Sequence, residues 1–295
     1  MATISPEARQ LAELQARGSS QGGPRASHEE IIEACIAEHQ PSPEGAEAFR
    51  GWFRTWRTEV KPKDRAILDR GTRLDLRLQE RAFAAWSWGE GPVVLLLHGI
   101  HGNSGQLTRF VDPLVDAGLR VVAFDAPAHG DNPGNSTDIF EFYELYLAVV
   151  QAVGEAYAVL SHSFGNTWAL YSLARGSAAQ RVVCLAPPAE QSYLFQTWRT
   201  IHSLGDQAAE EFIAMHHARF GPFEDYDNKG FARRIAARAL IFHDREDPII
   251  PYEVGGERLA AAWPGAEFVA TEGLGHYRIL KDEAVLRRVV AFLGA

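Results

Sequence analysis

The feature that most limits the fold of this chain is a series of six short apolar runs separated by helical patterns. The runs lie at residues 93–97, 120–124, 156–160, 181–185, 239–242 and 267–270. Their hydrophobicity is continuous rather than alternating, which is typical of strands covered on both faces. The alternation with helices indicates parallel strands joined by crossover connections. We therefore predict an α/β fold with a doubly wound, mostly parallel sheet.

Two further segments flank or interrupt this pattern. Residues 72–88 alternate between polar and apolar side chains, which predicts two antiparallel edge strands. The interval between the fourth and fifth runs exceeds fifty residues and is rich in aromatic side chains at helical spacing. An insertion after the carboxyl end of a strand covers the place where ligands bind in open α/β sheets. We therefore interpret residues 187–238 as a helical lid.

The first 70 residues have helical patterns and no strand signal. Residues 5–18 and 27–40 are predicted helices, joined by a flexible stretch at residues 19–24. The second helix begins with a capping box, because Glu30 follows Ser27 by three residues. This region is therefore predicted to be a helical extension rather than part of the sheet.

A third helical pattern, from residue 44 to about residue 60, carries a stripe of aromatic side chains. Phe49, Trp52, Phe53 and Trp56 recur at the spacing of one helix face. We expect this stripe to pack on the main body or on a second subunit rather than to form a ligand-binding box. Three roles are open for the N-terminal helices: clamping the core, contributing to the lid, or forming a homodimer contact.

Composition excludes several classes of function. The chain has 295 residues, of which 46% are apolar, an ordinary globular composition. Its net charge of −9 would repel nucleic acid. No apolar run approaches the ~18 residues that span a bilayer, and the N-terminus lacks a basic segment followed by an apolar one, so we expect a cytoplasmic protein. Cys35 and Cys184 are interpreted as reduced, buried thiols.

A candidate nucleophile, Ser163, lies between the third apolar run and a helical pattern. A tight strand-to-helix turn lifts a side chain out of the sheet, and the N-terminus of the helix favours a developing negative charge. The residues two before and two after must be small, and here they are Ser161 and Gly165. The usual residue at the first position is glycine, so Ser161 departs from the pattern G-x-S-x-G.

A serine nucleophile needs a neutral imidazole to take its proton and a carboxylate to orient that imidazole. His276 follows the last apolar run and is preceded by Gly273 and Gly275, which free the backbone to present it. Asp247 follows the preceding run and stands directly before Pro248. The order Ser163, Asp247, His276 is consistent with a catalytic triad at the carboxyl ends of three strands.

Each of these assignments has alternatives. Asp244 lies three residues before Asp247 and could serve as the acid, and Glu190 is a weaker alternative. His162 adjoins the serine, but its side chain is expected to point away from it. His129 lies in a turn-forming sequence and is expected to be structural. Position within the turn favours Asp247 and His276.

Five motifs together resemble the α/β-hydrolase fold family, in its branch of serine-nucleophile esterases and lipases. They are Leu97-His98-Gly99-Ile100, Asp125-Ala126-Pro127-Ala128-His129-Gly130, Ser161-His162-Ser163-Phe164-Gly165, Asp247-Pro248-Ile249-Ile250-Pro251 and Gly275-His276. The resemblance covers about three quarters of the chain. It implies an N-terminal helical extension at residues 1–70 and an α/β-hydrolase domain at residues 71–295, which includes the lid at residues 187–238.

The resemblance also implies an activity and a set of site residues. Ser163, Asp247 and His276 would form the triad, and the backbone N–H groups of Phe164 and Ile100 would form the oxyanion hole. The implied enzyme is a carboxylesterase-like serine hydrolase that cleaves an ester, thioester or related acyl bond of a small, largely apolar substrate through an acyl-enzyme. An acyltransferase or a carbon–carbon bond hydrolase could use the same triad, and a non-catalytic ligand-binding protein is a third hypothesis.

No cofactor or metal is expected from the motifs. His28 begins a helix that lacks the second histidine of a helical zinc site, and His216 and His217 are adjacent, so they face different sides of a helix. Gly99, Gly102 and Gly105 have the wrong spacing for a dinucleotide loop. The expected partner is therefore a small-molecule acyl substrate.

Overall fold

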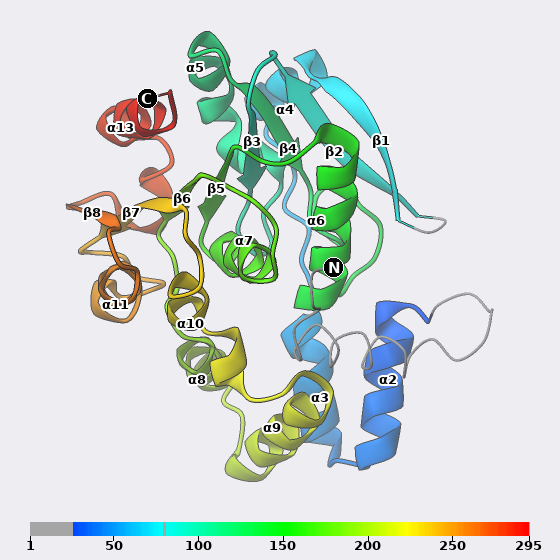
Figure 1. The fold of residues 1–295 in the computed structure, drawn as a ribbon. Coiled ribbons are helices and arrows are strands. Elements are labelled where there is room, and N and C mark those ends of the chain that lie inside the picture. The colour runs from blue at the N-terminus through cyan, green and yellow to red at the C-terminus, as the bar shows by residue number, and fades with distance from the viewer. Residues whose placement is uncertain (1–25, 79–80, 295) are drawn as a thin grey trace, which may run out of the picture.

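The computed structural model describes residues 26–78 and 81–294. The helix expected at residues 5–18 and the joint at residues 19–24 lie outside these residues. The described chain contains an eight-stranded sheet with the strand order β1-β2-β4-β3-β5-β6-β7-β8 (Figure 1). The strands are β1 (Thr72–Leu78), β2 (Arg81–Trp88), β3 (Val93–Leu97), β4 (Arg120–Phe124), β5 (Ala158–His162), β6 (Arg181–Leu185), β7 (Arg238–Asp244) and β8 (Glu267–Thr271).

The sheet is mostly parallel, as the six apolar runs predict. Strands β3 to β8 pair in parallel, whereas β2 pairs in antiparallel fashion with both β1 and β4. The expectation of two edge strands at residues 72–88 is therefore wrong for β2, which lies inside the sheet. Six consecutive residues of β2 are buried, because its neighbours cover both of its edges.

Both faces of the sheet are covered, which explains the continuous hydrophobicity of its strands. In β3, Leu95 belongs to one hydrophobic cluster and Leu96 to the other. The first face carries α6 (Ile139–Val153), α7 (Gly165–Ala174) and α11 (Gly256–Ala262). The opposite face carries α4 (Pro62–Arg70), η1 (Ser104–Phe110), α5 (Val111–Asp116) and α13 (Glu283–Gly294). Two short helices, η3 (Tyr252–Val254) and α12 (Gly275–Arg278), lie in the connections around β8.

The segment between β6 and β7 is helical, and it lies beside the N-terminal helices rather than on a face of the sheet (Figure 1). It contains α8 (Gln191–Ile201), α9 (Asp206–Phe220), η2 (Phe223–Tyr226) and α10 (Asn228–Ala232). The N-terminal helices are α2 (His28–His39), which has the predicted capping box, and α3 (Pro43–Phe53). The helix α3 is shorter than expected, because Arg54 is extended and forms a bridge with Ser136.

The aromatic stripe of α3 packs within the same chain. The rings of Phe49 and Phe212 of α9 lie 5.7 Å apart in an edge-on contact. At the start of α3, the backbone N–H and the hydroxyl of Ser42 both donate hydrogen bonds to Glu211 of α9. The fourth aromatic residue of the stripe, Trp56, lies beyond the end of the helix and is 54% exposed. The stripe therefore joins α3 to α9.

Two smaller expectations concern the cysteines and membrane segments. Cys35 and Cys184 are buried and form no disulfide, as predicted. Burial also raises the pKa of the Cys184 thiol, which keeps it protonated. Within residues 26–78 and 81–294, no helix has the length and apolarity needed to cross a bilayer.

Candidate active site

Ser163 lies in the tight turn that joins β5 to α7. Its φ of 53° is in the left-handed region, which a residue with a Cβ adopts only where the surroundings hold it. Its backbone N–H donates to the carbonyl of Leu185 at the end of the neighbouring strand β6, at 3.0 Å. A Cβ added to Gly165 would lie only 2.3 Å from the carbonyl oxygen of His98. The small residue after the serine therefore lets α7 approach the loop after β3.

The structure brings the three side chains of the expected triad together. The Oγ of Ser163 lies 2.9 Å from Nε2 of His276, and Nδ1 of His276 lies 2.7 Å from Oδ2 of Asp247. All three residues are at least nine-tenths buried. With an ionised Asp247, Nδ1 of His276 carries the proton and Nε2 is free to accept one from the serine. This arrangement can activate the hydroxyl as a nucleophile.

The carboxylate of Asp247 is held by donors on both of its oxygens. Oδ1 accepts hydrogen bonds from the N–H groups of Ile249 and Ile250, and Oδ2 faces His276. Burial by itself would raise the pKa of Asp247, but the hydrogen bonds from His243, His276 and Ile250 outweigh it and lower that pKa well below its usual value. The side chain that orients His276 is therefore ionised at neutral pH.

A second histidine, His243, contacts the same carboxylate, and the sequence reasoning missed it. The N–H of Gly256 donates to Nδ1 of His243, so the proton of this ring is on Nε2. Nε2 donates to the carbonyl of Ile250 at 2.8 Å and lies 3.4 Å from Oδ2 of Asp247. His243 therefore fixes the loop that carries Asp247. Its position at the end of a strand was the available signal.

His162 also supports the site, although it was expected to point away from it. Its Nε2 donates to the backbone carbonyl of His276 at 2.9 Å, because a carbonyl can only accept. Burial, assisted by the nearby His276, lowers the pKa of His162 to about 3, so the ring stays neutral. The residue before the nucleophile thus holds the backbone of the residue that would serve as its base.

Ser161 occupies the position where the usual pattern has glycine, and its hydroxyl has a defined partner. The Oγ donates to Oδ1 of Asn166 at 2.7 Å. The amide nitrogen of Asn166 in turn donates to the carbonyls of Ser163 and Leu185, at 2.8 and 3.1 Å. The departure from glycine therefore adds a buried hydrogen-bond chain that fixes the turn around Ser163.

Phe164 directly follows Ser163 in the chain, and Ile100 lies in the loop after β3. Neither backbone N–H donates a hydrogen bond to another described backbone group. A Cβ added to Gly99 would lie 3.0 Å from the Cβ of Ser163, so the loop after β3 passes next to the nucleophile. Two unengaged N–H groups on either side of a serine can stabilise an oxyanion.

The alternative residues are engaged elsewhere. Asp244 accepts hydrogen bonds from the hydroxyl of Thr271 and the N–H of Leu274, so it organises the loop before His276. Glu190 pairs with Lys229 and Arg258.

Two histidines near the loops after β3 and β4 are likewise structural. His98 donates from Nδ1 to the carbonyl of Gly99 and accepts at Nε2 from the N–H of Ala126. His129 donates from Nδ1 to the carbonyl of Pro127. Both rings therefore brace the loops that border the site.

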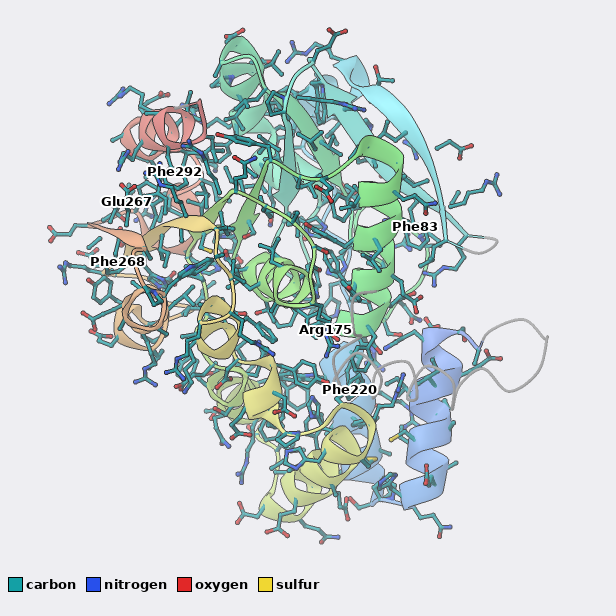
Figure 2. The ribbon with its side chains drawn as sticks, viewed as in Figure 1. Phe83, Arg175, Phe220, Glu267, Phe268 and Phe292 are labelled. Atoms are coloured by element: carbon teal, nitrogen blue, oxygen red, sulfur yellow. The ribbon has the colours of Figure 1, made fainter. Side chains whose placement is uncertain are left out.

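A cavity of about 460 Å³ adjoins the site. Ile100 and Phe164 line it from the sheet, and α8 and α9 supply Trp198 and Phe220. Figure 2 labels Phe220 at the end of α9, where its ring stacks at 5.4 Å on that of Phe140 in the first turn of α6. The cavity is therefore enclosed between the carboxyl ends of the strands and the helices of residues 187–238.

The histidines considered for a metal site have other partners. Nδ1 of His28 bonds to Ser136, and its Nε2 lies 3.3 Å from Asp138. His216 packs against Phe223, with ring centroids 4.3 Å apart. Within the part of the chain that the structure describes, no group of three or more histidine, cysteine or acidic side chains could hold a metal ion.

Two sequence comparisons place these residues among known proteins. The model of the alpha/beta hydrolase family matches residues 94–288. A human protein named serine hydrolase-like protein is 31% identical over 90 residues, which are 28% of this chain and 44% of that protein. The chain therefore matches less than half the length of this relative.

Solved structures share the fold at low sequence identity. An esterase from Pyrococcus furiosus aligns with a TM-score of 0.61 and 19% identity, over 82% of this chain and 96% of its own. A bromoperoxidase from Bacillus anthracis aligns with a TM-score of 0.60 and 14% identity, over 75% and 99% of the two chains. A monoacylglycerol lipase from Paleococcus ferrophilus has a TM-score of 0.56 and 22% identity, over 72% and 98%.

Proposed function

The chain belongs to the alpha/beta hydrolase family, and we propose that it is a serine hydrolase of esters, thioesters or related acyl compounds that uses Ser163, His276 and Asp247. The observation that carries this proposal is the pair of contacts at 2.9 and 2.7 Å that joins the three side chains. A purely ligand-binding protein would have no need of a hydroxyl, an imidazole and a carboxylate in this arrangement.

The proposed reaction proceeds through two steps at one carbonyl carbon. Ser163 attacks the carbonyl while its proton moves to Nε2 of His276, and the imidazolium then protonates the leaving group as the bond to it breaks. Water attacks the resulting acyl-enzyme in the same way, releasing the acid and restoring Ser163. Asp247 stays ionised throughout and stabilises the imidazolium.

The negative oxygen that forms in each step needs donors. The N–H groups of Phe164 and Ile100 are the proposed oxyanion hole, supported by the approach of the loop after β3 to Ser163. Neither N–H donates to a backbone carbonyl among the described residues. Ser163 also precedes α7, whose N-terminus favours negative charge at the same place.

Residues 187–238 are the proposed lid, and the substrate is proposed to be small and largely apolar. Support comes from the cavity, which aromatic rings line between these helices and the sheet. Pockets of this size and composition bury most of the surface of a small ligand. The chemistry at Ser163 would be the same for many acyl groups, so the cavity would set the choice among them.

A fluorophosphonate probe tests the proposed nucleophile. We expect the intact chain to become labelled on Ser163, as located by mass spectrometry of its peptides, and to lose hydrolysis of p-nitrophenyl acetate in parallel. The Ser163→Ala variant should fold but show neither labelling nor hydrolysis, because it lacks the hydroxyl that forms the adduct. The control is Ser172→Ala, which removes a buried hydroxyl of α7 that donates to the carbonyl of Trp168 in the same helix. Labelling elsewhere with full activity in Ser163→Ala would contradict the proposal.

Acyl transfer to an alcohol and cleavage of a carbon–carbon bond use the same triad and remain the second candidates. They differ from hydrolysis of an ester in the products. Incubation with an ester in the presence of a second alcohol, and separately with a diketone, followed by product analysis, separates the three reactions.

A further inference from the structure

The N-terminal helix α3 forms part of the wall of the cavity beside Ser163. Trp52, Phe53 and Arg54 line it, together with Trp56 just beyond the helix. These residues precede residues 94–288, the part of the chain that matches the hydrolase family. A wall of the cavity therefore comes from a segment outside the family match.

Trp52 joins this wall to the helices of residues 187–238, as does Phe53 through its contact with Phe220 at 5.1 Å. The ring of Trp52 makes edge-on contacts with Phe195 and Trp198 of α8, with Phe212 of α9 and with Phe223, at centroid distances of 5.7 to 6.3 Å. Four aromatic partners on three elements hold the indole in one position. Trp52 therefore gives the cavity a rigid aromatic surface rather than a mobile one.

The cavity lies beside the proposed oxyanion hole, and Ser163 itself does not line it. Ile100 and Phe164, whose N–H groups would bind the oxyanion, both line it. His276, which would protonate the leaving group, does not line it, and neither does its neighbour Tyr277. A leaving group must lie near Nε2 of His276, which leaves the cavity for the acyl group of the substrate.

The titratable groups of the cavity leave it without an unpaired buried charge. Burial lowers the pKa of His101 and of His216 to about 4, so both rings are neutral at pH 7. Asp138 is committed to the N-terminus of α6, where it accepts from the N–H groups of Phe140 and Glu141, and to His28. Arg54, the arginine of the lining, is half exposed and pairs with Glu47 at 3.2 Å. A carboxylate on the acyl group would therefore lose its water shell and have to compete with Glu47 for a partner.

We propose that Trp52 is a specificity-determining residue and that the cavity receives acyl groups bearing an uncharged aromatic ring. This inference rests on the proposed hydrolase function. Aromatic pairs contribute beyond their buried area, so an aryl group in this cavity gains over an alkyl group of similar size. The N-terminal helices thus belong to the substrate site and are more than a clamp on the core.

Four esters with one leaving group test the proposal on the intact chain: p-nitrophenyl acetate, hexanoate, 3-phenylpropanoate and the adipate half-ester. We expect kcat/KM for the phenylpropanoate to exceed that for the hexanoate by about fivefold. The adipate, which differs from the hexanoate by a terminal carboxylate, should be poorer by at least about tenfold. In Trp52→Leu the ratio of phenylpropanoate to hexanoate should fall to about one.

Control variants separate the loss of the ring from a general loosening of the protein. Trp88→Leu removes a tryptophan of β2 that does not line the cavity, and it should leave the ratio unchanged. Trp52→Phe keeps an aromatic ring and should keep the preference. If Trp52→Leu does not fold, Trp52→Met removes the ring with a side chain that packs more adaptably.

The outcomes distinguish this inference from the proposed function. An intact chain that hydrolyses the acetate with no preference for the phenylpropanoate overturns the inference alone. The same holds if Trp52→Leu keeps the preference, or if Trp88→Leu loses it equally. An intact chain that neither hydrolyses the acetate nor accepts the fluorophosphonate on Ser163 overturns the function and the inference together.

Discussion

At the scale of single residues, Asp247 and Asp244 lie three positions apart but have different partners. Asp247 faces His276, whereas Asp244 bonds to Thr271 and the N–H of Leu274. The same loop therefore contains one carboxylate that orients an imidazole and one that shapes the backbone leading to it. Sequence alone could only prefer Asp247 by its place before Pro248.

We predict that Asp247→Asn lowers kcat by about 10⁴-fold with little change in stability, because the amide favours the wrong tautomer of His276. Asp244→Asn should retain most of kcat but lower the free energy of unfolding by about 1–3 kcal/mol, since its buried donors lose a charged acceptor. Steady-state kinetics and chemical denaturation of both variants provide the check. A larger loss of kcat in Asp244→Asn than in Asp247→Asn would show that Asp244, and not Asp247, orients His276.

A second residue-scale prediction concerns Ser161. Replacing it by the glycine usual at this position removes the hydrogen bond to Asn166 and adds backbone freedom to the unfolded chain. Ser161→Gly should lower the free energy of unfolding by about 2 kcal/mol and Ser161→Ala by about 1 kcal/mol, as measured by urea denaturation. Equal stability of the intact protein and the two variants would show that the hydrogen bonds through Asn166 contribute nothing to the free energy of unfolding.

At the scale of elements, the strands were the most predictable part of the fold. Strands β3 to β7 are largely buried on both faces, so their sequences are mostly apolar and their positions could be predicted closely. The edge strand β8 is half-buried, but Phe268, Val269 and Ala270 still form an apolar run. The helix α4 was missed because Leu68 is its only buried residue and charged side chains dominate its sequence. The end of α3 was misplaced because the bridge from Arg54 to Ser136 depends on a residue far along the chain.

The residues of the candidate site could be predicted where they lie in recognisable turns after the ends of strands. Ser163, Asp247 and His276 follow the ends of strands, where parallel topology brings residues together. The position of His243 near the end of β7 was a signal, but its contact with the loop of Asp247 could not be predicted, because it depends on how that loop folds back on the strand. The N-terminal wall of the cavity was left open among three roles, since only the folded chain shows α3 next to α9.

The close approach of α7 to the loop after β3 gives an element-scale prediction. Gly165→Ala should strongly destabilise the protein and abolish hydrolysis, because its Cβ would meet the carbonyl oxygens of His98 and Leu97 at 2.3 and 2.8 Å. The matched control is Gly230→Ala in α10, whose added Cβ would have no neighbour closer than 4.0 Å. The midpoint of thermal unfolding and the rate of p-nitrophenyl acetate hydrolysis, measured for both variants, check this prediction. A Gly165→Ala protein with normal activity would contradict the tight packing.

At the scale of the whole molecule, buried neutral histidines make stability depend on pH. Burial, the largest cause in each case, lowers the pKa of His129 and His162 to about 3 and that of His216 to about 4. In the unfolded chain each ring takes up a proton below about pH 6.5. Between these values the unfolded state binds more protons, so acid favours unfolding. Burial also lowers the pKa of His101 to about 4 and lowers that of His98. His28, whose pKa the Asp138 carboxylate raises in spite of burial, acts in the opposite sense but is one group against five.

We therefore predict a free energy of unfolding that is level above about pH 6.5 and falls toward about pH 4, by up to about 1.4 kcal/mol per pH unit for each of these histidines. Urea denaturation across this range measures the slope. His216→Phe keeps an aromatic ring against Phe220 and Phe223. It should reduce the slope of the free energy of unfolding against pH by the contribution of one histidine, up to about 1.4 kcal/mol per pH unit. An unchanged slope in this variant would show that His216 titrates normally in the folded state.

The partnership of α3 with α9 has a consequence for synthesis of the protein. The two helices are separated by more than 150 residues, since α3 ends at Phe53 and α9 begins at Asp206. At about 5–20 residues per second, a ribosome needs roughly ten to thirty seconds to make the intervening chain. During this time the aromatic stripe of α3 lacks its partner α9 and is an exposed apolar surface to which chaperones can bind. Because His276 is made later still, the proposed triad can assemble only after residue 276 has left the ribosome.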